Sequence, residues 1–352
     1  MTGTKSIGIG MVGSGFMGLT YSEATSRYVQ GARLVAVTGG TRAPALAAEY
    51  AIPTEPDLAA LLAREDVHAV VLATPDLHHC AQTLQAAAAG THVLVEKPMA
   101  PSVAECDRMI AACRAAGVNL AVVQTERYRK LTLRARQLIT EGAIGEIRML
   151  RTVSFFPAPV ARDIIASRPW YVDPAGGGLF MGIATHNTDF LLWLVGAPAV
   201  QVYAQVETFD DTGWDAQSVM AQIRFANRVM GHMWISAEAP PPSLPSSEVR
   251  FQVVGSEGIL DFENFEYLDL GKGDKWERVY TPPRFDYFKE PKHPARMEPH
   301  VGVVQEFVDS ILEQRAPRVG GAEGRAAVEL CEACLVSART RAAVTLPLTG
   351  ES

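Results

Sequence analysis

The chain contains little that would place it in a membrane or an oxidising compartment. Only five of its 352 residues are cysteine, an odd and small number that argues against a disulfide framework. The longest apolar run, around residues 190–200, is too short to span a bilayer. The N-terminal stretch MTGTKSIGIGMVGSG has an apolar run broken by glycines and no cleavage site of a secretory signal. We therefore expect a cytoplasmic protein.

The chain also lacks a basic excess. Its net charge is −7, and 48% of its residues are hydrophobic and 20% charged, as in ordinary globular proteins. These values predict neither a nucleic-acid partner nor a membrane partner. Cys331 and Cys334 form a C-x-x-C within a helical pattern, but no second Cys or His pair stands nearby to complete a zinc site. We interpret them as two small buried residues, and we predict no metal site.

The pattern of predicted helices and strands changes near residue 125. Before it, short Val/Leu-rich strands alternate with Ala-rich helices, which predicts βαβ units and a parallel sheet covered on both faces. After it, longer strand patterns follow one another with turn residues between them, which is typical of an antiparallel sheet. Two helices close the chain. The predicted fold class is α/β, with a dinucleotide-binding domain at 1–125 and a substrate-binding and oligomerisation domain at 126–352.

A glycine fingerprint lies between the first strand and the first helix. It is G-x-G-x-x-G, formed by Gly13, Gly15 and Gly18. The first glycine permits a tight turn, the second lets a pyrophosphate approach the backbone, and the third lets the helix pack closely on the strand. The N–H groups and dipole of the helix then favour the phosphate charge. This pattern predicts a dinucleotide site.

The second strand ends without the acid that binds the ribose hydroxyls of NAD in this type of domain. Gly39 and Gly40 stand there, followed by Thr41 and Arg42. The missing charge removes repulsion against a 2′-phosphate, and Arg42 is able to pair with it. NADP is therefore favoured over NAD, and both remain open.

Three further motifs carry a resemblance to a known family. They are T-P-x-x-x-H at the end of one strand (Thr74 to His79), E-K-P at the end of another (Glu96 to Pro98), and a glycine triplet at 176–178 followed by His186 and Asp189. Together with the fingerprint they resemble the Gfo/Idh/MocA family of glucose–fructose oxidoreductase-like and inositol dehydrogenase-like enzymes. The resemblance covers nearly the whole chain.

The resemblance implies an N-terminal Rossmann domain with a doubly wound parallel sheet, and a C-terminal α/β domain with a large open, mostly antiparallel sheet. It implies homodimers or homotetramers built through that sheet. It also implies a cis Lys97–Pro98 peptide, an isomer open chiefly to bonds before proline. The cofactor-binding residues that we expect are Gly13, Ser14, Gly15, Phe16, Met17, Gly39, Thr41, Arg42, Thr74, Pro75, Leu77, His79, Glu96 and Lys97.

Lys97 and His186 are the expected catalytic residues. Oxidation of a secondary alcohol requires a group that takes the O–H proton, and a partly desolvated lysine beside the positive nicotinamide is suited to this role. A helix that starts near the glycines puts Gly182, His186 and Asp189 on one face. His186 would bond the reacting hydroxyl, with Asp189 orienting it. Many family members have Asp at the position of Gly182, and we expect the glycine to open space there for a bulkier substrate or a water.

Other expected substrate contacts are Arg127 and Tyr128, which follow the strand leading into the second domain, and Trp170, whose ring is suited to a sugar face. For each of these residues, a structural role as an ion pair or a packing residue fits the sequence as well as a substrate contact does. The predicted function is an NAD(P)-dependent dehydrogenase or reductase that acts on a sugar, inositol or related cyclic polyol. Two alternatives remain open. One is an NAD-dependent glycoside-cleaving enzyme that oxidises its sugar transiently, and the other is a non-catalytic dinucleotide-binding sensor.

Overall fold

The computed structural model describes residues 6–176 and 178–348. Gly177, the middle glycine of the triplet, lies outside the described residues. The described residues form two compact units, the first made of residues 6–128 and 285–325, the second of residues 129–176, 178–284 and 326–348. The predicted division at 125/126 placed residues 285–325 in the second domain, whereas these residues pack with the first unit.

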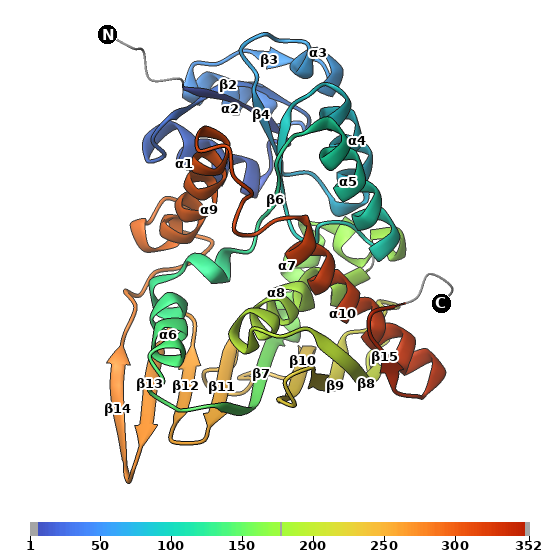
Figure 1. Ribbon diagram of the computed structural model, residues 1–352. Helices are drawn as coiled ribbons and strands as arrows, with labels where there is room; N and C mark the ends of the chain where they lie inside the picture. The colour runs from blue at the N-terminus through green and yellow to red at the C-terminus, as the bar shows by residue number, and fades with distance from the viewer. Residues whose placement is uncertain (1–5, 177, 349–352) are drawn as a thin grey trace. The chain divides into compact units, whose positions relative to one another are not determined.

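The first unit is built on a six-stranded parallel sheet in the order β3-β2-β1-β4-β5-β6 (Figure 1). Its strands are β1 (Ile7–Val12), β2 (Ala32–Thr38), β3 (Thr54–Glu55), β4 (Ala69–Leu72), β5 (His92–Val95) and β6 (Leu120–Val122). This is the strand order of doubly wound dinucleotide-binding domains, with the switch point between β1 and β4. Every residue of β1 is buried, as expected for a strand covered on both faces.

The helices of the first unit are α1 (Phe16–Arg27), α2 (Ala43–Tyr50), α3 (Leu58–Leu62), η1 (Asp76–His78), α4 (His79–Ala88), α5 (Val103–Ala116), η2 (Thr125–Tyr128) and α9 (Pro294–Leu312). Helix α5 has local end signals, since Ser102 accepts the Glu105 N–H at its start and Gly117 takes φ +67° at its end. Helix α9 supplies Val304 and Phe307 to the same core as Ile9 and Val71 of the sheet. Its apolar face explains why residues 285–325 join this unit.

The second unit contains a nine-stranded sheet in the order β14-β13-β12-β11-β7-β10-β9-β8-β15. Its strands are β7 (Ile147–Pro157), β8 (Ala199–Glu207), β9 (Ser218–Phe225), β10 (Met230–Ala239), β11 (Arg250–Gly255), β12 (Ile259–Glu263), β13 (Tyr267–Lys272), β14 (Lys275–Tyr280) and β15 (Val344–Thr345). Only the β7–β10 pair of this sheet is parallel among the strand pairs of the described residues. The predicted fold class, with its mostly antiparallel second sheet, is confirmed.

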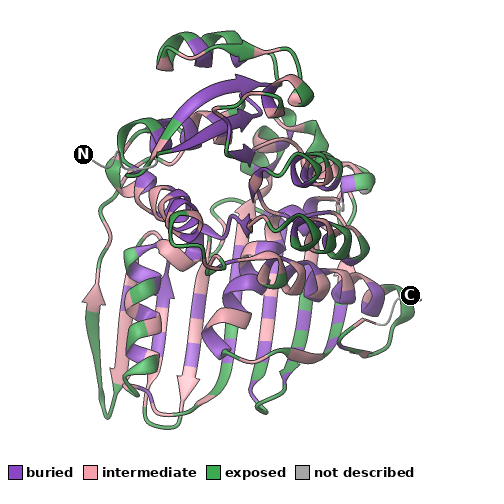
Figure 2. Ribbon diagram, turned by 45° about the horizontal axis from the view of Figure 1, so that its top comes forward, coloured by how far each residue is buried: buried purple, intermediate pink, exposed green. Residues whose placement is uncertain are grey.

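The helices of the second unit are α6 (Lys130–Thr140), α7 (Ala158–Ala166), η3 (Pro169–Val172), η4 (Pro174–Gly176), α8 (Gly178–Val195) and most of α10 (Gly321–Thr340). Along β9 buried residues alternate with more exposed ones, and Figure 2 shows such banding on the neighbouring strands. One face of the sheet therefore carries a core and the other is open. Cys331 and Cys334 are buried free thiols on α10, and burial raises the pKa of Cys331 to about 12. Within the described residues, no helix has the length and apolarity needed to cross a bilayer.

Candidate active site

The glycine turn between β1 and α1 has the geometry that the fingerprint predicts. Gly13 takes φ +104°, and a Cβ there would lie 2.5 Å from the carbonyl oxygen of Ala73. A Cβ on Gly18 would lie 2.0 Å from the carbonyl oxygen of Gly13, so only glycine lets α1 approach so closely. A Cβ on Gly15 would have open space around it. The turn therefore leaves its backbone accessible on the side where a phosphate approaches.

Ser14 gives an independent indication that this turn fits a polar ligand. Its side chain is only 4% exposed, and its buried Oγ has no hydrogen-bond partner among the described residues. Buried hydroxyls are normally satisfied, so the orphaned oxygen suits a phosphate or an ordered water that bonds to it. The residues present thus fit the pyrophosphate of a nicotinamide dinucleotide.

The end of β2 offers no carboxylate. Gly39 and Gly40 have φ values of +79° and +80°, and Thr41 and Arg42 are exposed beside them. A Cβ on Gly39 would make only ordinary contact with Gly13, at 3.5 Å, whereas one on Gly40 would lie 2.5 Å from Ser14 Oγ. The space beside the phosphate-binding turn therefore admits a side chain more readily at position 39 than at position 40.

The segments after β4 and β5 lie side by side, because these strands are parallel neighbours. Thr74, Pro75 and Leu77 are half-buried, and Thr74 Oγ1 donates to Gln82. His79 is fully enclosed instead, with its two ring nitrogens at 2.9 and 3.0 Å from the carbonyl oxygens of Pro98 and Thr74. Burial lowers the pKa of His79 to about 4, although these carbonyls act in the opposite direction.

The E-K-P segment follows β5, and its Lys97–Pro98 peptide is cis, as predicted. Lys97 is half-buried and its backbone N–H donates to Glu96 Oε2 at 2.8 Å. The other carboxylate oxygen of Glu96 accepts the hydroxyl of Tyr21, at 2.5 Å. Burial and the neighbouring Glu96 raise the pKa of Tyr21 far above its ordinary value. Sequence reasoning missed Tyr21, although a tyrosine in a helix that packs on a sheet must find a partner for its hydroxyl.

Arg127 and Tyr128 are half-buried on η2 of the first unit. The ring of Tyr128 packs against α9, where a Cβ on Gly302 would lie 3.1 Å from it. Arg296 of the same helix is fully buried, and its guanidinium lies 4.4 Å from the centre of the Phe16 ring. It also donates to Thr20 at 3.0 Å. Phe16, the expected cofactor residue, is thus supported by a segment of the chain that sequence reasoning did not connect to it.

The second unit holds the other predicted residues. The predicted helix is confirmed as α8, where His186 is half-buried and Asp189 is 1% exposed. Two neighbours of His186 anchor this helix. Asn187 Nδ2 donates to Thr152 Oγ1 of β7 at 2.6 Å, and Thr188 Oγ1 donates to the carbonyl oxygen of Ala327 on α10 at 3.0 Å. The orientation of His186 therefore depends on a well-anchored helix.

The expectation about Gly182 was wrong. The space beside it is not open, because the ring of Tyr171 fills it: a Cβ on Gly182 would lie 3.1 Å from that ring. Tyr171 comes from η3, and it packs on a small core with Leu179 and Ala237. Trp170, its neighbour, is 38% exposed. Glycine at 182 thus admits an aromatic ring, and nothing in the sequence pattern paired these two residues.

Together, these features define a nicotinamide dinucleotide-binding domain joined to a mixed-sheet domain. Comparison with known families agrees. A family described as "Oxidoreductase family, NAD-binding Rossmann fold" matches residues 7–124, and "GFO/IDH/MocA C-terminal domain" matches residues 132–261. The chain belongs to the GFO/IDH/MocA family. The predicted class, an NAD(P)-dependent oxidoreductase of CH–OH groups, is confirmed at this level, with NAD binding as the family's cofactor function.

Three similar proteins indicate how far the likeness extends. Inositol 2-dehydrogenase of Rhizobium meliloti is 26% identical, over 96% of this chain and 98% of that protein. 2,7-Anhydro-N-acetylneuraminate hydratase of Mediterraneibacter gnavus is 34% identical, but over only 41% of this chain and 38% of that protein. The WlbA dehydrogenase from Bordetella pertussis, solved with NADH and UDP-GlcNAcA, is 27% identical with a TM-score of 0.83, covering 98% of this chain and 99% of that one.

Proposed function

We propose that the chain is an NAD(P)-dependent dehydrogenase or reductase that acts on a secondary hydroxyl or ketone of a sugar, inositol or related cyclic polyol. The observation that carries this proposal is the near full-length likeness to inositol 2-dehydrogenase, combined with Lys97 at the carboxyl end of β5. In open parallel sheets that end is where ligands bind.

The bound nicotinamide would supply or accept the hydride. The chain's own residues bind and orient its partners: the turn at residues 13–17 holds the pyrophosphate through backbone N–H groups. Lys97 takes the hydroxyl proton during oxidation and returns it during reduction. His186 bonds the same hydroxyl and Asp189 orients the imidazole. The approach of Lys97 and His186 to one substrate stays a prediction.

The experiment is a nicotinamide absorbance assay with a panel of inositols, aldoses and anhydrosugars and both cofactors. Thermal shifts come first, because a ligand that binds only the folded protein raises its melting temperature. Lys97→Met should abolish turnover but keep cofactor binding, whereas the exposed Lys275→Met on β14 should change neither. Turnover retained by Lys97→Met would refute the assigned role.

We also propose that NADP is preferred. The support is the β2 end, which lacks a carboxylate and places exposed Arg42 just after Gly39 and Gly40. Replacing Arg42 by alanine should weaken NADPH binding more than NADH binding, because only the former presents a 2′-phosphate. Equal losses, or none, would contradict the assignment.

A second function has one specific support. The hydratase relative shares 34% identity over its aligned part, which favours the NAD-dependent glycoside-cleaving alternative, an enzyme that oxidises its sugar only transiently and ends with its cofactor unchanged. Such an enzyme would copurify with a dinucleotide and would convert substrate without a lasting absorbance change. A sensor, by contrast, would bind cofactor and convert no member of the panel.

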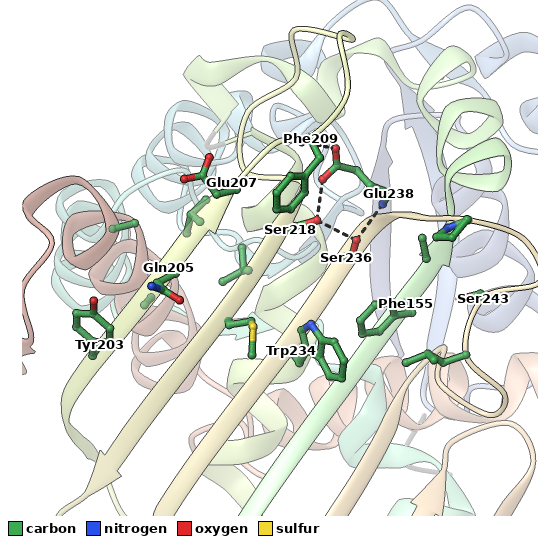
Figure 3. A pocket seen from close by; sticks show the side chains of 18 of the residues that line it. Phe155, Tyr203, Gln205, Glu207, Phe209, Ser218, Trp234, Ser236, Glu238 and Ser243 are labelled. Atoms are coloured by element: carbon green, nitrogen blue, oxygen red, sulfur yellow. Dashed lines mark hydrogen bonds between the residues drawn. The ribbon is translucent and has the colours of Figure 1, made fainter.

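The expected homodimer or homotetramer is proposed to form through the open face of the second sheet. A groove of about 910 Å³ lies there, lined by residues of β7 to β10, and Figure 3 shows its labelled side chains. Phe155 and Trp234 meet edge to face at 4.7 Å, and Tyr203 and Met220 are 40% and 47% exposed. Met220→Lys should lower the mass measured by light scattering, whereas Leu133→Lys, equally exposed on α6, should not.

The cytoplasmic location also stays a proposal. It is supported by five cysteines that are all buried and form no disulfide, which suits a reducing compartment. Fractionation of cells that express the tagged chain tests it, and recovery of the protein outside the cytoplasm would refute it.

A further inference from the structure

Buried groups hold the backbone on both sides of Lys97. On one side the Lys97 N–H donates to Glu96 Oε2, and Glu96 Oε1 accepts the hydroxyl of Tyr21. Glu96 is 7% exposed and Tyr21 is fully buried. A carboxylate taken out of water needs such donors, and bonds to a charged acceptor are stronger than neutral ones. The position of the Lys97 backbone is thus tied to a side chain of α1.

On the other side, His79 lies against the carbonyl oxygen that follows Lys97 by one residue. Its Nδ1 is 2.9 Å from Pro98 O and its Nε2 is 3.0 Å from Thr74 O. Carbonyl oxygens only accept, so an N–H of the ring donates to one of these strand-end segments while the ring packs against the other. At 1% exposed, His79 has little surface left for a cofactor contact.

We propose that Tyr21, Glu96 and His79 are positioning residues that fix Lys97 for proton transfer, rather than cofactor contacts. The inference rests on the proposed role of Lys97. Tyr21 lies on the helix that begins at the glycine turn. The same helix therefore supports both the phosphate-binding backbone and, through Tyr21 and Glu96, the lysine. A fixed ammonium loses less conformational freedom when it meets the substrate hydroxyl, which raises kcat rather than affinity.

The test uses Tyr21→Phe with Tyr50→Phe as its matched control. Tyr50 also donates to a glutamate, Glu23 Oε2 at 2.7 Å, in the same unit, and this bond does not involve Glu96 or Lys97. Hydrogen–deuterium exchange of the Lys97 amide should become about tenfold faster in Tyr21→Phe, because loss of a bond to a charged group is of this size. Tyr50→Phe should leave this amide unchanged. Equal rates in the wild type and Tyr21→Phe would overturn the proposal.

Two further measurements separate positioning from a merely structural role. Tyr21→Phe should keep NADH affinity within about threefold and lower kcat at constant KM on whichever polyol the panel identifies. His79→Leu should speed exchange around residues 96–99 while His79→Gln, which restores an N–H donor, should recover part of the protection. His78→Gln, on the exposed neighbour, is the control.

The exchange experiment needs no substrate, so it stands apart from the proposed function. If Lys97→Met keeps full turnover, the proposed role of Lys97 fails whatever the exchange rates are. If Lys97→Met is inactive and Tyr21→Phe weakens NADH binding at unchanged kcat, Tyr21 and Glu96 serve the cofactor and the positioning role is wrong. If Tyr21→Phe does not fold, Glu96→Gln replaces it. That amide still accepts from Lys97 N–H but loses the charge, so slower turnover with partial protection is expected, and full protection with full kcat would overturn the proposal.

Discussion

Replacing Gly39 by aspartate at the end of β2 should lower the affinity for NADPH relative to NADH. The new Cβ would meet only Gly13, at 3.5 Å, which is ordinary contact. The backbone there has φ +79°, a conformation that costs an L residue about 1–2 kcal/mol, with aspartate among the better tolerated. A carboxylate near a 2′-phosphate repels it by about 1 kcal/mol in water and about 4 kcal/mol at lower effective dielectric. Since residue 39 is exposed, we expect about 2 kcal/mol.

That free energy corresponds to a fall of about 30-fold in the affinity for NADPH relative to NADH. The assay is fluorescence titration of both reduced cofactors, repeated at higher salt, where screening should shrink the ratio. Gly90→Asp is the control for backbone strain, because Gly90 has φ +71° and open space around its position. Gly40→Asp should weaken both cofactors, since its Cβ would lie 2.5 Å from Ser14 Oγ. A ratio within threefold of the wild type in a folded Gly39→Asp protein would refute the reasoning.

Three other predictions concern stability and the cofactor turn. Gly18→Ala should abolish NADH binding, because its Cβ would lie 2.0 Å from a backbone oxygen; retained affinity in a titration would contradict this. Phe190→Ala should lower the free energy of unfolding by about 3–5 kcal/mol, since its buried ring meets that of Phe251 at 4.5 Å; a loss below about 1 kcal/mol in urea denaturation would be inconsistent with that packing. Burial raises the pKa of Glu263 from 4.5 to about 7. Between these pH values the folded state holds more protons than the unfolded state, so stability should fall as pH rises, by an amount on the order of 3 kcal/mol, and level off above pH 7. Glu263→Gln should remove this slope, exposed Glu266→Gln should keep it, and equal slopes in all three proteins would rule the effect out.

The first sheet could be predicted in detail because its signals are local. Buried apolar runs, Ala-rich helices and the glycine fingerprint each act within one βαβ unit. The strand patterns coincide with β1, β2, β4, β5 and β6, whereas the two-residue strand β3 was not predicted. The second unit was predicted less completely. Helices α6 and α7 were missed because their short amphipathic patterns sit between strong strand patterns. The stretch at 248–262 has the sequence pattern of one continuous strand, although residues 256–258 form a turn that divides it into β11 and β12.

Within the site, the residues expected to bind the ligand through their backbone or their charge could be proposed from sequence. The residues that pack against them or hydrogen-bond to them could not. Tyr21 lies 75 positions from Glu96, and the ring of Tyr171 occupies the place opened by Gly182. Neither pair shares a motif, because the contact depends on how two elements pack. The glycine at position 182 predicted open space beside the helix, but the structure has the ring of Tyr171 there. A small residue inside a helix is thus ambiguous until its neighbour is known.

Residues 285–325 pack with the first unit, and this contact also could not be predicted from a local sequence pattern. Helix α9 has an apolar face like that of any amphipathic helix, and the sequence does not say which core it covers. Its contribution reaches the glycine turn itself, because buried Arg296 packs on Phe16 at 4.4 Å and bonds to Thr20 of α1. Removing a partner of a buried guanidinium is costly, so this contact helps to hold α9 against α1. The dinucleotide-binding unit is therefore assembled from two segments far apart in the chain, and its phosphate-binding turn depends on the later one.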